Sequence, residues 1–137
     1  MVRRPANVAL ASVGAAVALA VAACGSPAAD LFAVARSGAV AGADITVIAS
    51  GDGTVRCDGH RHELPDPLLL TAENLADEIT TPASKALRLR SGPHPVYTYV
   101  VDTPDGVFSY SDDSPHQGKV LEQLQAWVLT VVRTVCD

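Results

Sequence analysis

Residues 96–111 read VYTYVVDTPDGVFSYS, and this stretch decides the fold. From Val96 to Asp102 the residues alternate with the two-residue period of a β-strand that has one buried face. Pro104-Asp105-Gly106 is a turn sequence, and residues 107–111 return with the same alternation. The stretch therefore predicts a β-hairpin of two antiparallel strands.

The chain after this hairpin predicts a terminal helix from about Lys119. Its apolar residues recur at helical spacing and form one stripe, with Trp127 beside it: Leu121, Leu124, Val128, Val131, Val132 and Val135. An earlier helix is predicted to start with Asp66 as N-cap and Pro67 at the first helical position. Thr81-Pro82 is expected to end that helix or to mark its last turn.

Upstream of the earlier helix the sequence predicts three strands, at residues 31–36, 44–50 and 54–58. Asp52-Gly53 is a strong hairpin signal between the last two of them. Residues 86–90 could form a short strand or an extended edge. The order is strand, strand, strand, helix, strand, strand, helix. It favours an α+β fold, a single antiparallel sheet of about five strands with two helices on one face.

The first residues have the layout of a secretory signal peptide. Arg3 and Arg4 supply positive charge, and sixteen uncharged residues follow from Val8 to Ala23. This run is mostly Ala, Val and Leu, and it is shorter than the roughly 20 apolar residues that a membrane-spanning helix needs. It ends in the sequence VAAC at residues 21–24, which resembles the lipobox of bacterial lipoproteins.

The resemblance to a lipobox implies that the thiol of Cys24 receives a diacylglycerol and that the chain is cut before this residue. Residues 1–23 would then be the cleaved signal peptide, 24–29 the lipidated N-terminus with a short tether, and 30–137 a single domain. Two or three acyl chains anchor a protein durably where one does not. We therefore expect a lipid-anchored protein on the extracytoplasmic face of the cell membrane.

From Cys24 onward the chain is acidic. These 114 residues contain all fifteen acidic residues but only eight of the ten basic ones, so their side-chain charges sum to about −7. No cluster of Lys and Arg occurs among them, although a nucleic-acid partner requires one. The expected partners are membrane lipid, through Cys24, and an unknown protein or envelope component, but no nucleic acid.

Three cysteines are an odd number for an exported chain. If Cys24 carries lipid, Cys57 and Cys136 remain, and two thiols outside the cytoplasm are expected to oxidise. We therefore predict a Cys57–Cys136 disulfide that closes a loop of about 80 residues. Because the two cysteines are so far apart in sequence, with no Cys-x-x-Cys spacing, a redox-active pair is not expected.

Two segments contain side chains that could carry chemistry. On a strand, the His60-Arg61-His62 sequence would present two imidazoles on one side, as a zinc site requires, but no third ligand accompanies it. His94 and His116 lie in loops rich in Pro and Gly. The serines and aspartates of residues 109–114 fit turn and capping roles, because no nucleophile elbow is present. We predict no catalytic residue, no metal site and no cofactor.

The aromatic residues of the hairpin allow two interpretations. Tyr97 and Tyr99 share one face of the first strand, and Phe108 and Tyr110 share one face of the second. They either pack beneath the helices or form an exposed face, since Tyr is enriched at protein interfaces. Tyr97, Tyr99 and Tyr110 are therefore a possible partner surface, and the hairpin 96–111 is a candidate edge for an added strand.

The segment from Leu31 onward resembles a group of small uncharacterised lipoproteins and secreted proteins of high-GC Gram-positive bacteria. The resemblance is carried by the following stretches: Leu31–Arg36, Gly42–Thr46, Asp52–Cys57, Val107–Asp112 and Val135-Cys136. It implies no activity. Arg36–Gly38 with Gly42, and the spacing of Leu121 and Leu124, are similar to the emfourin-like inhibitors of thermolysin-type metalloproteases. Ala39 interrupts the Ser-Gly-Gly pattern of that family, and we transfer no functional residue from either group.

Three functions of different classes follow from these observations. The first is a membrane-anchored extracytoplasmic domain that binds a protein or envelope partner and is not an enzyme. The second is a tethered protease inhibitor, and the third is a lipoprotein that binds a small molecule or a metal.

Overall fold

The computed structural model describes residues 29–137. The signal peptide, Cys24 and most of the tether lie outside these residues, so the expectations about them stay predictions. The elements in chain order are β1 (Asp30–Gly38), β2 (Ile45–Ser50), β3 (Thr54–Cys57), β4 (His60–Glu63), α1 (Asp66–Glu78), α2 (Thr80–Ser84), β5 (Tyr97–Thr103), β6 (Gly106–Ser111) and α3 (Gly118–Thr134).

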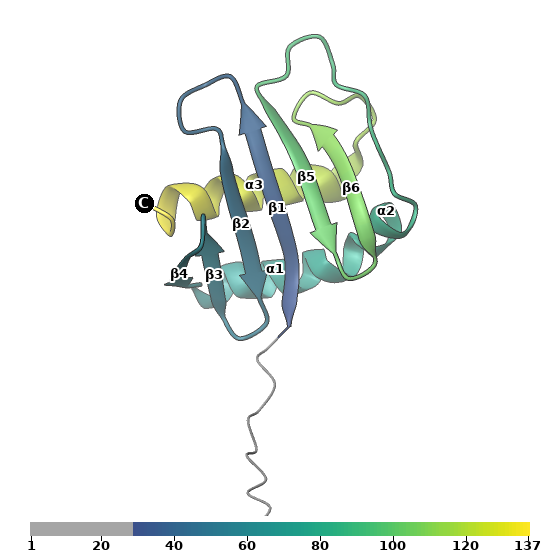
Figure 1. Cartoon of the computed structure of the whole chain (residues 1–137). Coiled ribbons are helices and arrows are strands. Elements are labelled where there is room, and N and C mark those ends of the chain that lie inside the picture. The colour runs from purple at the N-terminus through teal and green to yellow at the C-terminus, as the bar shows by residue number, and fades with distance from the viewer. Residues whose placement is uncertain (1–28) are drawn as a thin grey trace, which may run out of the picture.

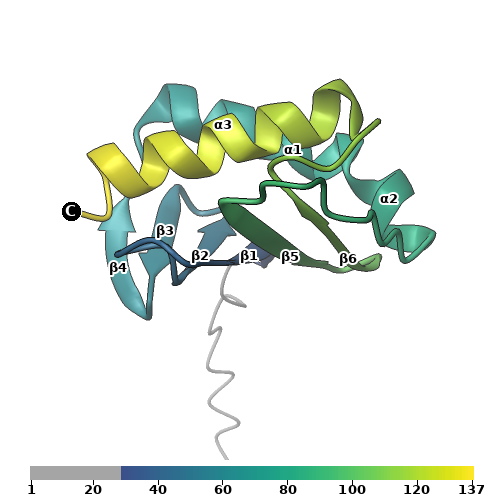
Figure 2. The same cartoon turned by 90° about the horizontal axis from the view of Figure 1, so that it is seen from above.

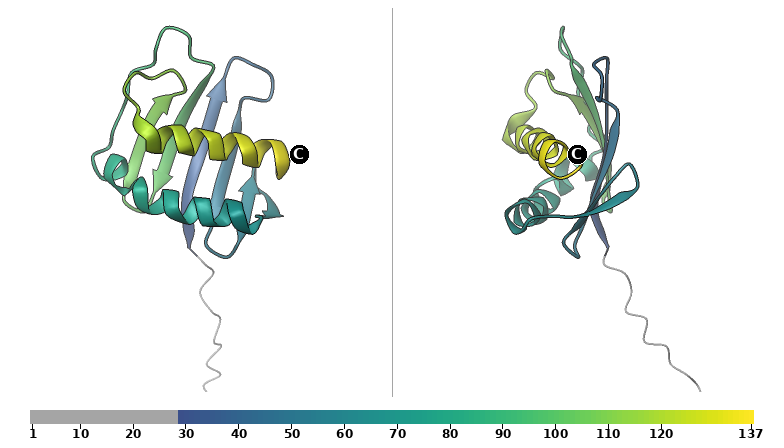
Figure 3. Two further views of the ribbon diagram at one scale, coloured as in Figure 1. Left: turned by 180° about the vertical axis from the view of Figure 1, so that it is seen from behind. Right: turned by 90° about the vertical axis from the view of Figure 1, so that its left-hand side faces the viewer.

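The six strands form one antiparallel sheet in the order β4-β3-β2-β1-β5-β6. Helices α1 and α3 lie side by side across one face of this sheet, and no element of residues 29–137 covers the opposite face (Figures 1 and 2). The view from behind in Figure 3 shows both helices crossing the strands. The predicted α+β class with one antiparallel sheet is confirmed, with six strands and three helices in place of about five and two.

The additional strand, β4, is formed by His60–Glu63, which lies outside the five strands predicted from the sequence. Asp58 and Gly59 both have positive φ, 48° and 85°, which is the conformation of a two-residue hairpin turn of the primed type. This turn pairs His60 with Cys57 and returns the chain along β3. The Asp58 carboxylate also accepts a hydrogen bond of 2.8 Å from the backbone N–H of Thr46, which joins the turn to β2.

The helix boundaries differ from the prediction in two places. The N-cap position of α1 is Pro65, which forms no side-chain cap, so Asp66 is the first helical residue and not the cap. Thr81-Pro82 does not end this helix, because α1 ends at Glu78 and the two residues belong to the short helix α2. Pro82 fits there because a backbone N–H in the first turn of a helix has no intrahelical partner to lose.

The core fills the space between the sheet and the two long helices. Trp127 of α3 joins three elements of it: its ring meets Phe32 of β1 edge to face, with centroids 5.3 Å apart, and its Nε1 donates a 2.9 Å hydrogen bond to the Leu68 carbonyl of α1. The predicted stripe of α3 supplies four further buried residues: Leu121, Leu124, Val128 and Val131.

Cys57 and Cys136 lie at disulfide-bonding distance, with their Cα atoms 5.7 Å apart, as the sequence predicted. The bridge joins β3 to the segment that follows α3, and Cys57 is buried in the core. It therefore attaches the last helix to the side of the sheet where β3 and β4 lie (Figure 1).

The edges of the sheet are not open along their whole length. At the β6 edge, the backbone N–H of Ser109 donates to Leu87 and the Ser109 carbonyl accepts from Leu89, both at 3.0 Å. The expected edge of the hairpin 96–111 is therefore limited to β6, since β5 is an interior strand, and residues 87–89 cover the middle of β6. The other edge, β4, has only four residues, a length that limits the addition of strands.

Within residues 29–137, none of the helices combines the length and the apolar character that crossing a bilayer demands.

Candidate functional site

Of the two interpretations of the hairpin tyrosines, packing beneath the helices holds for Tyr99 and Tyr110, which are therefore not part of a partner surface. Tyr99 and Tyr110 are only 3% and 1% exposed, because the alternation of β5 and β6 turns both toward the helices. Their rings stack with centroids 5.1 Å apart, and the Tyr110 hydroxyl donates a 3.1 Å hydrogen bond to the Leu121 carbonyl of α3. Burial raises the pKa of Tyr99 to about 12, and it raises the pKa of Tyr110 further. Both are core residues.

Tyr97, the third member, is half-buried and covers a buried arginine. The Arg36 guanidinium carbon lies 4.5 Å from the centre of the Tyr97 ring, a cation–π contact. Arg36 also donates hydrogen bonds to the carbonyls of Ala43 (2.9 Å) and Gly42 (3.0 Å). This pair therefore attaches the β1–β2 loop to the sheet.

The aspartates after β6 hold the neighbouring loop. Asp113 accepts hydrogen bonds from the backbone N–H groups of Gly92 (2.9 Å) and His94 (2.7 Å) and from the Ser111 hydroxyl (2.8 Å). Desolvation raises the pKa of Asp113, but the hydrogen bonds from Ser111, His94 and Gly92 outweigh it and bring the pKa below its usual value. Asp112 accepts from the backbone of Val96 at 3.0 Å. These side chains stabilise the loop of residues 92–96.

The histidines do not assemble a site. His60 and His62 lie on β4 at one edge of the sheet, whereas His94 and His116 lie in loops beside β5 and β6. No three His, Cys, Asp or Glu side chains of residues 29–137 gather closely enough to hold a metal ion.

A groove with a volume of about 490 Å³ runs between α1 and α3. Its lining is a mixture of apolar and neutral polar side chains with one carboxylate: Leu68, Thr71, Asn74, Leu75, Glu78, Gln123, Ala126, Trp127 and Thr130. No histidine or serine belongs to this lining. The groove therefore contains no Ser-His pair of the kind that a serine hydrolase uses.

The uncovered face of the sheet is the remaining candidate. Register places a row of residues across it, one from each strand: Arg61, Arg56, Ile48, Ala33, Asp102 and Val107. A second row lies beside the first: Thr46, Ala35, Val100 and Ser109. We call these two rows the open face. Val100 and Val107 are 44% and 46% exposed, and with Arg88 and Ser109 they line a shallow hollow of about 180 Å³.

The open face carries charged residues near both of its sides. Arg56 and Arg61 lie on β3 and β4, where Arg56 pairs with Asp30 at 2.8 Å and Arg61 pairs with Asp52 at 3.5 Å. Asp102 lies on the other side, on β5, and forms no ion pair with any residue of 29–137. Both arginines on this side are thus paired within the chain, and Arg88 lies beside Ser109 and Val107 on the side of Asp102.

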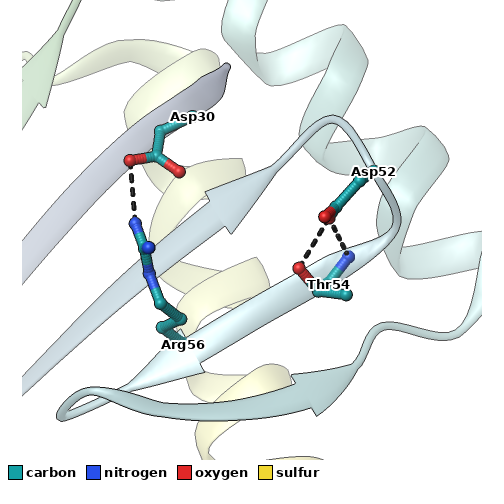
Figure 4. A network of polar contacts seen from close by, with 4 residues as sticks. All are labelled: Asp30, Asp52, Thr54 and Arg56. Carbon is teal, nitrogen blue, oxygen red and sulfur yellow. Dashed lines mark hydrogen bonds and ion pairs between the residues drawn. The ribbon is translucent and has the colours of Figure 1, made fainter. Parts of the chain in front are cut away.

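Asp52 keeps the β2–β3 turn in shape beside the arginines. Its carboxylate accepts hydrogen bonds from the Thr54 hydroxyl at 2.6 Å and from the Thr54 backbone N–H at 3.0 Å (Figure 4). The Thr54 hydroxyl bond is the main reason that the pKa of Asp52 lies below its usual value. Arg56 is anchored by Asp30 in the same view, so its position on the open face is defined.

No family model matches the chain, and neither the curated proteins nor the solved structures contain a match to it. The candidate site therefore rests on its own geometry.

The sequence contained a signal for the open face, since the alternation that buries Tyr99 and Val101 points Val100 and Asp102 outward. It did not contain the strand order that brings Arg56 and Asp102 into one row.

Proposed function

We propose that this chain is a lipid-anchored domain of the outer face of the cell membrane that binds a protein partner through the open face and catalyses no reaction. The observation that carries the proposal is a whole sheet face that no element within residues 29–137 covers, and on which Val100 and Val107 are exposed. Exposed apolar patches rimmed by polar residues mark interaction sites. The VAAC sequence at 21–24 and the cysteine pair at bonding distance support export.

The direction of β1 supports an anchored arrangement. This strand begins at Asp30, directly after the tether, and its start lies at the same end of the sheet as the β2–β3 and β5–β6 turns (Figure 1). Residues 25–29 reach less than about 20 Å even when extended. With Cys24 in the bilayer, that end of the sheet faces the membrane and the open face is directed sideways, toward other proteins in the same membrane.

The anchor is tested by replacing Cys24 with alanine in the full chain, expressed in a high-GC Gram-positive host. We expect the wild-type protein in the detergent phase after phase separation and nearly all of the C24A protein in the aqueous phase, because the acyl chains supply the affinity for the membrane. Mass spectrometry of the wild-type N-terminal peptide should find a diacylglyceryl group on Cys24. The C57A/C136A double variant is the control and should stay in the detergent phase. An unmodified Cys24 would contradict the anchor.

The binding surface is tested by placing a charge on the open face. We expect V100R to reduce the capture of cross-linked partners from native membranes by at least about tenfold, because an arginine in the middle of an interface disturbs packing and brings an unpaired charge. L70R is the matched control, since Leu70 is 60% exposed on α1 on the opposite side of the sheet. Equal losses for V100R and L70R, or no loss for either, would refute the open face as the binding surface.

A further inference from the structure

A hollow of about 290 Å³ lies on the helix side of the sheet, apart from the open face. The side chains around it come from β5, from the residue after β6 and from one side of α3, and they include Tyr97, Tyr99, Asp112, Glu122, Gln125 and Leu129. Tyr97 pairs with Gly38, the last residue of β1, so the hollow lies at the end of the sheet opposite to the start of β1. Figure 3 shows α3 crossing the sheet nearer to that end than α1 does.

The Tyr99 hydroxyl is a buried polar group without a partner in this hollow. Tyr99 is only 3% exposed, and its hydroxyl forms no hydrogen bond with any group of residues 29–137, whereas the Tyr110 hydroxyl donates to the Leu121 carbonyl. Every fully enclosed side-chain N or O atom in this part of the chain has a partner, so the Tyr99 hydroxyl reaches the surface, at the hollow that Tyr99 lines. Its hydrogen bond therefore has to come from solvent or from a ligand.

A buried cation lies next to the hollow, but its donors point elsewhere. Arg36 is 5% exposed, is covered by the Tyr97 ring, and donates to the carbonyls of Ala43 and Gly42. Burial raises the pKa of Tyr99 most, and the charges of Arg36 and Asp112 act on that pKa in opposite directions, so both charges lie within electrostatic reach of the hydroxyl. Arg36 thus adds one positive charge beside the hollow without lining it.

Two carboxylates line the hollow, and neither forms an ion pair within residues 29–137. Asp112 is half-buried, and only its Oδ1 atom accepts hydrogen bonds, from the backbone N–H groups of Val96 and Tyr97. Glu122 is exposed at the rim. The Asp112 Oδ2 atom and both Glu122 oxygens are therefore available as acceptors, and the site stays negative even when Arg36 is counted.

We propose that this hollow binds the side chain of an arginine from a protein or peptide partner. A guanidinium has five N–H donors in one plane and no acceptor, so it can donate to Asp112, Glu122 and the Tyr99 hydroxyl together. Its methylene stem can pack against Tyr97 and Leu129. An anion would instead meet two carboxylates, and an ammonium group concentrates its donors at one point. The inference does not rest on the proposed function, since the open face contributes nothing to this site.

The test titrates the peptide acetyl-Ala-Arg-Ala-amide into the isotopically labelled full chain, purified in mild detergent, and follows the backbone amide signals by nuclear magnetic resonance. We expect saturable shifts with a millimolar dissociation constant, centred on Tyr97 and Ala126. The same peptide with citrulline in place of arginine keeps the planar group but has no charge. It should bind at least about tenfold more weakly, because hydrogen bonds between two charged groups are the stronger ones.

Two variants remove the acceptors without removing the walls of the hollow. D112N/E122Q takes away both charges but keeps an oxygen for the backbone N–H of Val96, and it should weaken binding of the arginine peptide by at least about tenfold. Y99F keeps the ring that stacks on Tyr110 and removes only the hydroxyl, so we expect a loss of about threefold. The unfolding midpoint of D112N/E122Q should match that of wild type, since the loop keeps its hydrogen bonds.

The matched control is E73Q/D77N, which removes two carboxylates from exposed positions on α1 outside the hollow and should leave binding unchanged. V100R should also leave it unchanged, which separates this site from the open face. The proposal is overturned if the arginine peptide gives no saturable shifts or if the citrulline peptide binds equally well. It is also overturned if D112N/E122Q loses no more binding than E73Q/D77N.

Discussion

Replacing Cys57 and Cys136 together with alanine should lower the free energy of unfolding by about 4 kcal/mol. The two residues are 79 positions apart, so the bridge closes most of the domain into one loop and removes many conformations from the unfolded chain. The double variant is preferable to either single one, because a single replacement leaves a thiol free to form a wrong bridge. Without the bridge, the end of α3 loses its covalent link to β3.

The measurement is urea unfolding followed by the fluorescence of Trp127, the only tryptophan of the chain and 2% exposed in the fold. C24A is the control, since Cys24 precedes the domain and its replacement should leave the midpoint unchanged. The same loss should appear when wild type is unfolded with reducing agent present. A decrease below about 1 kcal/mol would mean that the bridge does not constrain the unfolded chain as its loop length requires.

The elements predicted best from the sequence have strong local patterns. The 96–111 hairpin and the terminal helix appear where the alternation and the helical stripe place them, and the Pro104-Asp105 turn joins β5 to β6. Gly106 is required there, with a φ of 141° and a position where a side chain would meet the Ala83 carbonyl. Such features depend on residues that are neighbours in sequence, so one window contains the whole signal.

The features that were missed depend on weaker or more distant signals. β4 has no apolar residue in its His-Arg-His-Glu sequence, and only the Asp58-Gly59 turn before it indicates a hairpin. The tyrosines were ambiguous because a strand pattern shows which residues share a face but not which face the helices cover. The open face requires the position of β5 beside β1, a pairing between distant segments that no local pattern reveals.

Replacing Trp127 with alanine should destabilise the domain by about 3–5 kcal/mol, comparable to the loss of the disulfide. The side chain is the point where β1, α1 and α3 meet, through the edge-to-face contact with Phe32 and the hydrogen bond to the Leu68 carbonyl. Alanine removes both contacts and leaves a cavity between two helices that cannot close it without moving. W127F separates the contributions, because it keeps an aromatic ring near Phe32 but cannot donate to Leu68.

We expect W127F to lose clearly less than W127A, about 1–2 kcal/mol, from one hydrogen bond and a smaller ring. The measurement is thermal and urea unfolding followed by far-ultraviolet circular dichroism, since both variants lack the tryptophan signal. L129A is the matched control on α3: Leu129 is 42% exposed and should cost well under 1 kcal/mol. If W127A behaves like L129A, then the two long helices are not joined to the sheet through this residue, and the α1–α3 layer is held mainly by the aliphatic stripe of α3.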